Sequence, residues 1–195
     1  MIQDNFIRRK NDVLAKRDRS SIGRVDDRII KLCDKINKLK NYYTTSSCSG
    51  RILLMISQDK KAEGLFIKMH HDNVSLSELK KDIKEIIANK KLSGKRIKFK
   101  QEPCILHVAC RTLEDANVIY NKAKEAGWKN SGIIGIGKTQ YVVEMNSTEK
   151  IDFPIINKGK ILVDDNFLKI VLKDANDNMK KCWEKIRKLE NSIKD

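Results

Sequence analysis

The sequence predicts an α+β fold in which strand–strand–helix units are duplicated and form an antiparallel or mixed sheet. Three observations favour this class: short apolar runs occur in pairs, a helical pattern follows each of the first two pairs, and long helical patterns stand at both ends. The 195 residues are enough to bury a sizeable core. We expect a single domain, 1–195, with a helical part at 1–45, a β-rich core with two helices at 46–146, and a C-terminal helix at 164–193.

The N-terminal part is predicted to be helical. A weak, mostly charged helix is expected from Phe6 to Arg17, and a second from about 24 to 40, where apolar residues have helical spacing. The next segment, 41–51, reads N-Y-Y-T-T-S-S-C-S-G-R. It offers little apolar surface for packing, so interactions other than hydrophobic burial must give it a defined structure.

Three pairs of strands follow, and the expected pairs are 51–57 with 64–70, 96–100 with 104–110, and 131–137 with 140–146. We expect the second pair to be a hairpin that turns at Glu102 and Pro103. Ser75 and Glu78 form a capping box that opens a helix ending near Ala88.

The C-terminal half is predicted to hold two more helices. One runs from Thr112 to Ala126 and closes at Gly127. Two short strands or an extended connector are expected over 151–163. The last helix is capped by Asp164 or Asp165, and its apolar stripe is expected to pack against the sheet or the N-terminal helices.

The charge of the chain indicates a polyanionic partner. Its 41 basic and 26 acidic residues give a net charge of +15. Residues 1–100 hold 25 basic and 12 acidic residues, whereas 101–195 hold 16 and 14. An excess concentrated in one half favours binding to a polyanion such as a nucleic acid.

Several classes of protein are disfavoured. No apolar run approaches the length that crosses a bilayer, and the N-terminus has no apolar signal region, so we expect a cytoplasmic protein without membrane contact. The five cysteines form no C-x-x-C pair, which favours free thiols and no metal site. The glycines of 132–137 lie inside a strand pair with no helix behind them, so the dinucleotide-binding fingerprint is absent.

A basic strand is the candidate nucleic-acid contact. Arg96, Lys98 and Lys100 share one face of their strand, and Ile97 and Phe99 share the other. The charged face suits RNA phosphates. The alternative is a solvated edge strand that lysine protects against aggregation.

Two histidines and one cysteine are candidates for chemistry. His107 lies between apolar neighbours and is typical of a core histidine, whereas His70 ends a strand; either imidazole could accept a proton near neutral pH. Cys48 is a nucleophile if Arg51 lowers its pKa. We prefer an anion cradle of amides and hydroxyls in which Cys48 only fits.

At these residues the chain resembles the wybutosine-synthesizing protein 3 family, over about 6–186. The motifs that carry the resemblance are Y-T-T-S-S-C-S-G-R (43–51), E-P-C-I-L-H-V (102–108), Ser131-Gly132 after Gly127-Trp128, and D-R-S-S-I-G-R-V-D (18–26). One position departs from the family pattern, because Ile22 replaces the expected lysine.

The resemblance implies a methyl transfer from S-adenosyl-L-methionine to the ring nitrogen N(4) of the tricyclic base 3′ of the anticodon of phenylalanine tRNA. Other enzymes of the wyosine pathway are expected partners. We expect Ser46, Ser47, Cys48, Ser49, Gly50 and Arg51 to form the floor of the cofactor pocket, and Asp18, Ser20 and Gly23 to form a second wall. His70, His107 and Glu102 are the candidate proton acceptors or cofactor contacts.

Two other functions remain open from the sequence. One is a non-catalytic RNA-binding module that presents tRNA to another enzyme. The other is an acyl- or thiol-transfer enzyme that depends on Cys48.

Overall fold

The computed structural model describes residues 4–16, 26–58 and 64–194. Asp18, Ser20, Gly23 and Ile22 therefore lie outside the described residues. The chain divides into two compact units. Unit 1 comprises 1–49, 104–148 and 182–195, and unit 2 comprises 50–103 and 149–181.

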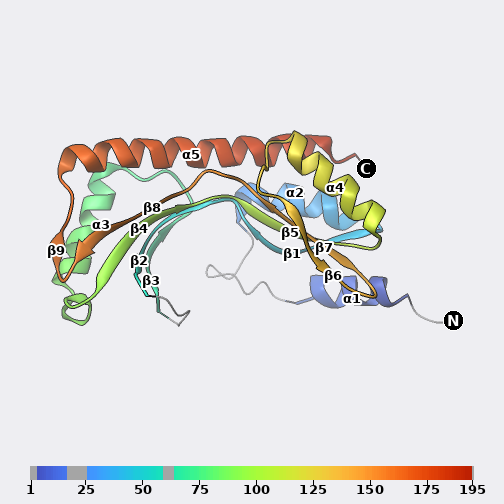
Figure 1. Ribbon diagram of the computed structural model, residues 1–195, viewed down its shortest axis with the longest axis horizontal. Helices are drawn as coiled ribbons and strands as arrows, with labels where there is room; N and C mark the ends of the chain where they lie inside the picture. Colours follow the sequence, from blue (N-terminus) through green and yellow to red (C-terminus); the bar gives the residue numbers. More distant parts are fainter. Residues whose placement is uncertain (1–3, 17–25, 59–63, 195) are drawn as a thin grey trace. The chain divides into compact units, whose positions relative to one another are not determined.

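Unit 1 is an antiparallel sheet with helices on both faces (Figure 1). The order of its strands is β1 (Tyr42–Cys48), β5 (Ile105–Cys110), β7 (Tyr141–Asn146) and β6 (Gly132–Ile136). Its helices are α1 (Asn5–Leu14), α2 (Asp27–Lys38), α4 (Leu113–Glu125) and the last part of α5 (Asp165–Ser192).

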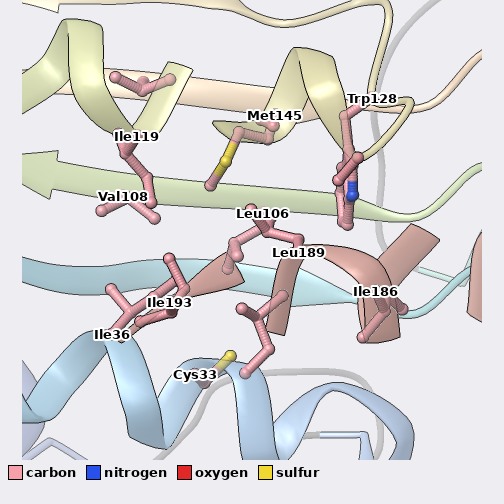
Figure 2. Close-up of a cluster of buried hydrophobic side chains, with 14 of the residues drawn as sticks. Cys33, Ile36, Leu106, Val108, Ile119, Trp128, Met145, Ile186, Leu189 and Ile193 are labelled. Carbon is pink, nitrogen blue, oxygen red and sulfur yellow. The ribbon is translucent and has the colours of Figure 1, made fainter. Parts of the chain in front are cut away.

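The core of unit 1 lies on one face of this sheet. Leu106 and Val108 of β5 pack with apolar residues of α2, α4 and the end of α5, as Figure 2 shows. The indole nitrogen of Trp128 donates a hydrogen bond to the carbonyl of Lys185 at 3.2 Å. The opposite face is covered in part by α1, through a smaller cluster of Phe6, Tyr43 and Ala109.

Unit 2 is also an antiparallel sheet. The strand order is β3 (Phe66–His70), β2 (Arg51–Ile56), β4 (Arg96–Glu102), β8 (Ile151–Asn157) and β9 (Lys160–Ile161). Its helices are α3 (Leu76–Ala88), the short 3-10 helix η1 (Lys90–Leu92) and the first part of α5. Phe99 of β4 stacks on Phe153 of β8, and Phe153 meets Phe167 of α5 edge-on, so α5 covers the Phe99 face.

Local signals in the sequence are confirmed. The capping box of Ser75 and Glu78 opens α3, and Thr112 forms a second box with Asp115 at α4. Gly127 has a φ of 92°, the left-handed conformation typical of a glycine after a helix. Asp164 caps α5 by accepting a hydrogen bond from the Phe167 amide at 2.8 Å. The α+β class and the antiparallel sheets are confirmed as well.

The expected hairpin between 96–100 and 104–110 is wrong. These strands are β4 and β5, and they belong to different sheets. Only Pro103 and Cys104 separate them. A two-residue hairpin needs residues that adopt positive φ, which proline cannot do, so the chain leaves one sheet here and enters the other.

The segment 41–51 contains a strand that apolar patterning does not reveal. β1 pairs with β5 over its whole length, with an irregularity between Thr44 and Ser46. Its Tyr43 ring is fully buried, and aromatic and β-branched residues favour strands even without alternating hydrophobicity.

We propose that the two units unfold together, as the single domain expected from the sequence. The chain passes between the units four times, and α5 supplies buried residues to each. Both tryptophans, Trp128 and Trp183, belong to unit 1, so their fluorescence reports that unit alone. In urea, fluorescence and far-ultraviolet circular dichroism should therefore show one coincident transition. A dichroism step that fluorescence does not share would contradict the proposal.

Candidate functional site

The segment 46–51 ends one sheet and begins the other. Ser46, Ser47 and Cys48 close β1, and Arg51 opens β2. Gly50 between them has a φ of 100°, which a side chain would strain. The boundary between the units falls between Ser49 and Gly50. The residues expected to form one pocket floor are thus divided between units 1 and 2.

One row of directly paired residues crosses the sheet of unit 1. Ser46 of β1 pairs with His107 of β5, His107 pairs with Glu144 of β7, and Glu144 pairs with Gly132 of β6. Directly opposed residues in antiparallel strands share a face. Three motifs singled out in the sequence, the S-S-C-S-G-R, E-P-C-I-L-H-V and Ser-Gly motifs, therefore meet in this row.

The row contains a specific hydrogen bond. The His107 Nε2 atom lies 2.8 Å from Glu144 Oε2, and both side chains are about one-quarter to one-third exposed. His107 lies on the face opposite the core, since Leu106 and Val108 beside it are the buried residues. The interpretation of His107 as a core histidine is wrong, because strand alternation turns its ring to the open face.

A second row lies beside the first. Cys48 pairs with Ile105, and Ile105 pairs with Asn146. The buried side-chain oxygen of Asn146 has no hydrogen-bond partner among the residues that the structure describes. A buried acceptor left without a donor is costly, which marks this place as one where a ligand could bind.

Ser49 connects the segment to the start of α2. Its hydroxyl is buried and donates a hydrogen bond to the carboxylate of Asp26. Asp26 also caps α2 by accepting from the Arg28 amide at 3.1 Å. Asp26 ends the motif that begins at Asp18, so the structure joins two of the motifs found in the sequence.

Arg51 and Glu102 come together in unit 2. They are directly opposed on β2 and β4, and the Arg51 Nε atom lies 2.7 Å from Glu102 Oε2. The guanidinium also lies over the Phe66 ring, 4.8 Å from its centroid. Ring, carboxylate and strand register together hold the guanidinium in one orientation.

The basic face of β4 is confirmed, but the edge-strand alternative is wrong. Arg96, Lys98 and Lys100 alternate with buried residues, and β4 lies between β2 and β8. Lys98 lies 3.4 Å from Asp152 of β8, and Lys100 lies 3.4 Å from Glu102. Acidic neighbours therefore offset part of the positive charge of this face.

His70 lies on the other face of the same sheet. Its Nε2 atom is 2.7 Å from Asp82 of α3, on the side that the helix covers. His70 pairs with Ile52, one residue from Arg51, so its side chain and that of Arg51 point to opposite faces. The structure does not bring His70 to Arg51 and Glu102.

The cysteines are free thiols, as expected. Cys48 is half-buried, whereas the other four are buried. Burial raises the pKa of Cys110 to about 12 and also raises the pKa of Cys104. Neither thiol is ionised to a useful extent at neutral pH. Because the other cysteines are buried, Cys48 is the accessible thiol.

Sequence reasoning missed Glu144 and Asn146. Glu144 is the single acid in the strand Y-V-V-E-M-N, and an acid in an otherwise apolar run is a usable signal. Asn146 ends the strand and carries no such signal. Asp26 lay inside a quoted motif, but its contact with Ser49 spans 23 positions and depends on the fold.

Comparisons with known proteins match this chain to one protein family. The family model described as "Methyltransferase TYW3" matches residues 8–195. A protein of Thermococcus sibiricus named "tRNA(Phe) 7-((3-amino-3-carboxypropyl)-4-demethylwyosine(37)-N(4))-methyltransferase" is 38% identical over 94% of this chain and 88% of its own length. The Homo sapiens "tRNA wybutosine-synthesizing protein 3 homolog" is 32% identical over 96% of this chain and 72% of its own.

The fold has solved counterparts as well. The structure of PH1069 protein from Pyrococcus horikoshii is similar with a TM-score of 0.85 and 35% identity, over 97% of this chain and 96% of that one. These matches confirm the resemblance that the motifs indicate. The chain belongs to the methyltransferase TYW3 family.

Proposed function

We propose that this protein is an S-adenosyl-L-methionine-dependent tRNA methyltransferase of wyosine-derivative biosynthesis. Its substrate is the tricyclic base 3′ of the anticodon of phenylalanine tRNA, and the methyl group goes to the ring nitrogen N(4). The observation that carries the proposal is the row of Ser46, His107, Glu144 and Gly132, which joins three motifs around one polar pair. Family membership favours this enzyme over a non-catalytic RNA-binding module.

The residues present fit the methyl donor. S-adenosylmethionine has hydroxyls and an ammonium group that need acceptors, and a carboxylate that needs donors. The unpartnered oxygen of Asn146 and the carboxylate of Glu144 supply acceptors on one face of unit 1. Ser46 and Ser47 of the same unit add hydroxyls. On the strength of the family motifs, we also propose Cys48, Ser49, Gly50 and Arg51, together with Asp18, Ser20 and Gly23, as cofactor contacts.

Proton handling is assigned to His107. When bound, the cofactor supplies an electrophilic methyl carbon on a sulfonium sulfur. If the Nε2–H of His107 donates to Glu144, its Nδ1 atom keeps a lone pair and accepts the proton that the substrate nitrogen gives up. Glu144 is then a positioning residue that fixes the tautomer and orientation of the ring. Glu102 orients Arg51 through their ion pair, and His70 contacts Asp82 and takes no part in the proton transfer.

The remaining assignments concern partners and place. We propose that Arg96, Lys98 and Lys100 contact tRNA phosphates, with Arg96, the most exposed of the three, contributing most. Within the described residues, no helix has the length and apolar character needed to cross a bilayer. The free thiols support a reducing compartment, and we propose the cytoplasm, where other wyosine-pathway enzymes are the expected partners.

The reaction itself is the first test. Purified protein with S-adenosylmethionine should add one methyl group to phenylalanine tRNA that carries the demethyl tricyclic intermediate, measured by mass spectrometry of the nucleosides. Unmodified tRNA should be inert, because its guanosine lacks the nucleophilic nitrogen. Methylation of that guanosine in the same assay would refute the assigned reaction.

The second test separates a cradle from a nucleophile at Cys48. In a cradle of amides and hydroxyls, Cys48→Ser should keep activity within roughly tenfold, or about 1.4 kcal/mol. Arg51→Ala removes a charge held by Glu102 and should cost on the order of a hundredfold or more. Single-turnover methyl transfer measures both, with Arg51→Lys as the charge-preserving control and circular dichroism as the folding check. A folded Cys48→Ser protein thousands of times slower would favour a covalent mechanism instead.

The third test concerns the His107–Glu144 pair. His107→Ala should lower kcat by roughly 10² to 10⁴ if it takes the proton. Glu144→Gln keeps the shape, but its amide can present an N–H to His107 in place of an acceptor oxygen, so the imidazole tautomer is no longer fixed and kcat should fall as well. Glu125→Gln, the same change at an exposed position of α4, is the matched control. A wild-type kcat for Glu144→Gln would show that Glu144 does not position His107 for proton transfer.

A further inference from the structure

A hollow lies between α1 and the turn that joins β6 to β7 in unit 1. Its larger part, of about 500 Å³, is lined by residues of α1, by Lys16 just after this helix and by Thr139. A part of about 400 Å³ continues along the turn from Gly135 to Gln140. Arg9 and Thr139 line both parts, so they form one continuous cleft. We call this the α1 cleft.

The α1 cleft is basic. Arg8, Arg9, Lys16 and Lys138 are exposed and line it, against a single acidic lining residue, Asp12. Within the part of the chain that the structure describes, none of the four cations forms an ion pair. Lys98 and Lys100 of β4, by contrast, have acidic partners. The α1 cleft is therefore the less compensated of the two positive surfaces.

The floor of the α1 cleft is the row of the sheet next to His107. Ala109 of β5 pairs with Val142, which pairs with Gly135, and both Val142 and Gly135 line the cleft. Ala109 is two residues from His107 on the same face, which places the two rows about 7 Å apart. The floor of the cleft and the row proposed for chemistry are therefore neighbouring rows on one face of the same sheet.

Two glycines beside the α1 cleft leave little room for a side chain. A Cβ atom on Gly135 would lie 3.3 Å from the Val142 Cβ, and one on Gly137 would lie 3.2 Å from the carbonyl oxygen of Gln140. Both positions therefore disfavour side chains. Gln140 in turn accepts a hydrogen bond from the Tyr43 hydroxyl at 2.5 Å, which ties the turn to β1.

Ile136, which lines the α1 cleft, and its near neighbour Ile134 are exposed apolar residues on an edge strand. Ile134 is 57% and Ile136 79% exposed on β6, at an edge of the sheet within the described residues. Proteins usually cover or charge such an edge. A second copy pairing here would bring two sets of the same cations together, whereas an RNA strand would neutralise them.

We propose that the α1 cleft binds backbone phosphates of the substrate tRNA, next to the nucleotide that is modified. Arg8, Arg9 and Lys16 contact the phosphates, and Ile136 contacts a ribose or base. This inference rests on the proposed function for the identity of the RNA. It places the main phosphate contacts of unit 1 on α1, which the sequence alone marked only as a weak, charged helix.

The test compares two triple variants in tRNA binding at several salt concentrations. The cleft variant is Arg8→Gln, Arg9→Gln, Lys16→Gln. The control variant is Lys31→Gln, Arg187→Gln, Lys188→Gln, which removes three exposed cations from the helices that cover the other face of the same sheet. Both lose three charges, so a difference between them reports location rather than net charge.

The cleft variant should lower the slope of log affinity against log salt by about 2, since each phosphate contact contributes roughly 0.7 to 0.9. Its KM for tRNA should rise by about tenfold or more, and the control variant should keep the wild-type slope. A wild-type slope in a folded cleft variant overturns the inference. A concentration-dependent dimer that Ile136→Asp dissociates, together with that unchanged slope, would assign the cleft to a second copy instead.

Methyl transfer by the unmutated protein is measured in the same samples. If that protein binds tRNA but transfers no methyl group, the proposed function fails, and the comparison of salt slopes still decides whether the cleft holds RNA. If it transfers the methyl group and the two variants share one slope, only the cleft assignment fails.

Discussion

Strand β5 must satisfy two opposite requirements on alternate residues, and the site in unit 1 depends on both. Leu106, Val108 and Cys110 are buried against three helices, and that burial fixes the register of the strand. His107 is then held on the open face, between Ser46 and Glu144. A slip of one residue would bury the imidazole and expose the leucine, so the same packing that stabilises the core also positions the chemistry.

The second organising contact is the buried hydrogen bond from Ser49 to Asp26. Asp26 serves α2 as its cap and serves segment 46–51 as an acceptor, so the helix start and the end of β1 are fixed by one carboxylate. This accounts for the order in segment 41–51, which has few apolar groups of its own. The segment lacks a hydrophobic face, and polar contacts and the buried Tyr43 ring stabilise it instead.

Local patterns in the sequence predicted the helices and strands better than they predicted which strands pair. The capping boxes at Ser75 and Thr112 and the left-handed Gly127 involve neighbours within a few residues, so they could be read directly. Strand pairing joins distant residues, and sequence order misled the pairing of β4 with β5 because the chain changes sheets at Pro103. His107 was identified from its motif, whereas its partner Glu144 lies 37 positions away and became visible only in the fold.

The interleaving of the two units has a consequence for synthesis on the ribosome. The core of unit 1 includes Cys182, Ile186, Leu189 and Ile193, near the end of the chain, packed with residues of α2 and β5. The final turns of α5 are synthesised long after α2 and β5, since more than 70 residues separate β5 from Cys182. During synthesis the apolar stripe of α2 and the buried face of β5 therefore lack part of their cover, and unit 1 can complete its core only once the last turns of α5 have emerged.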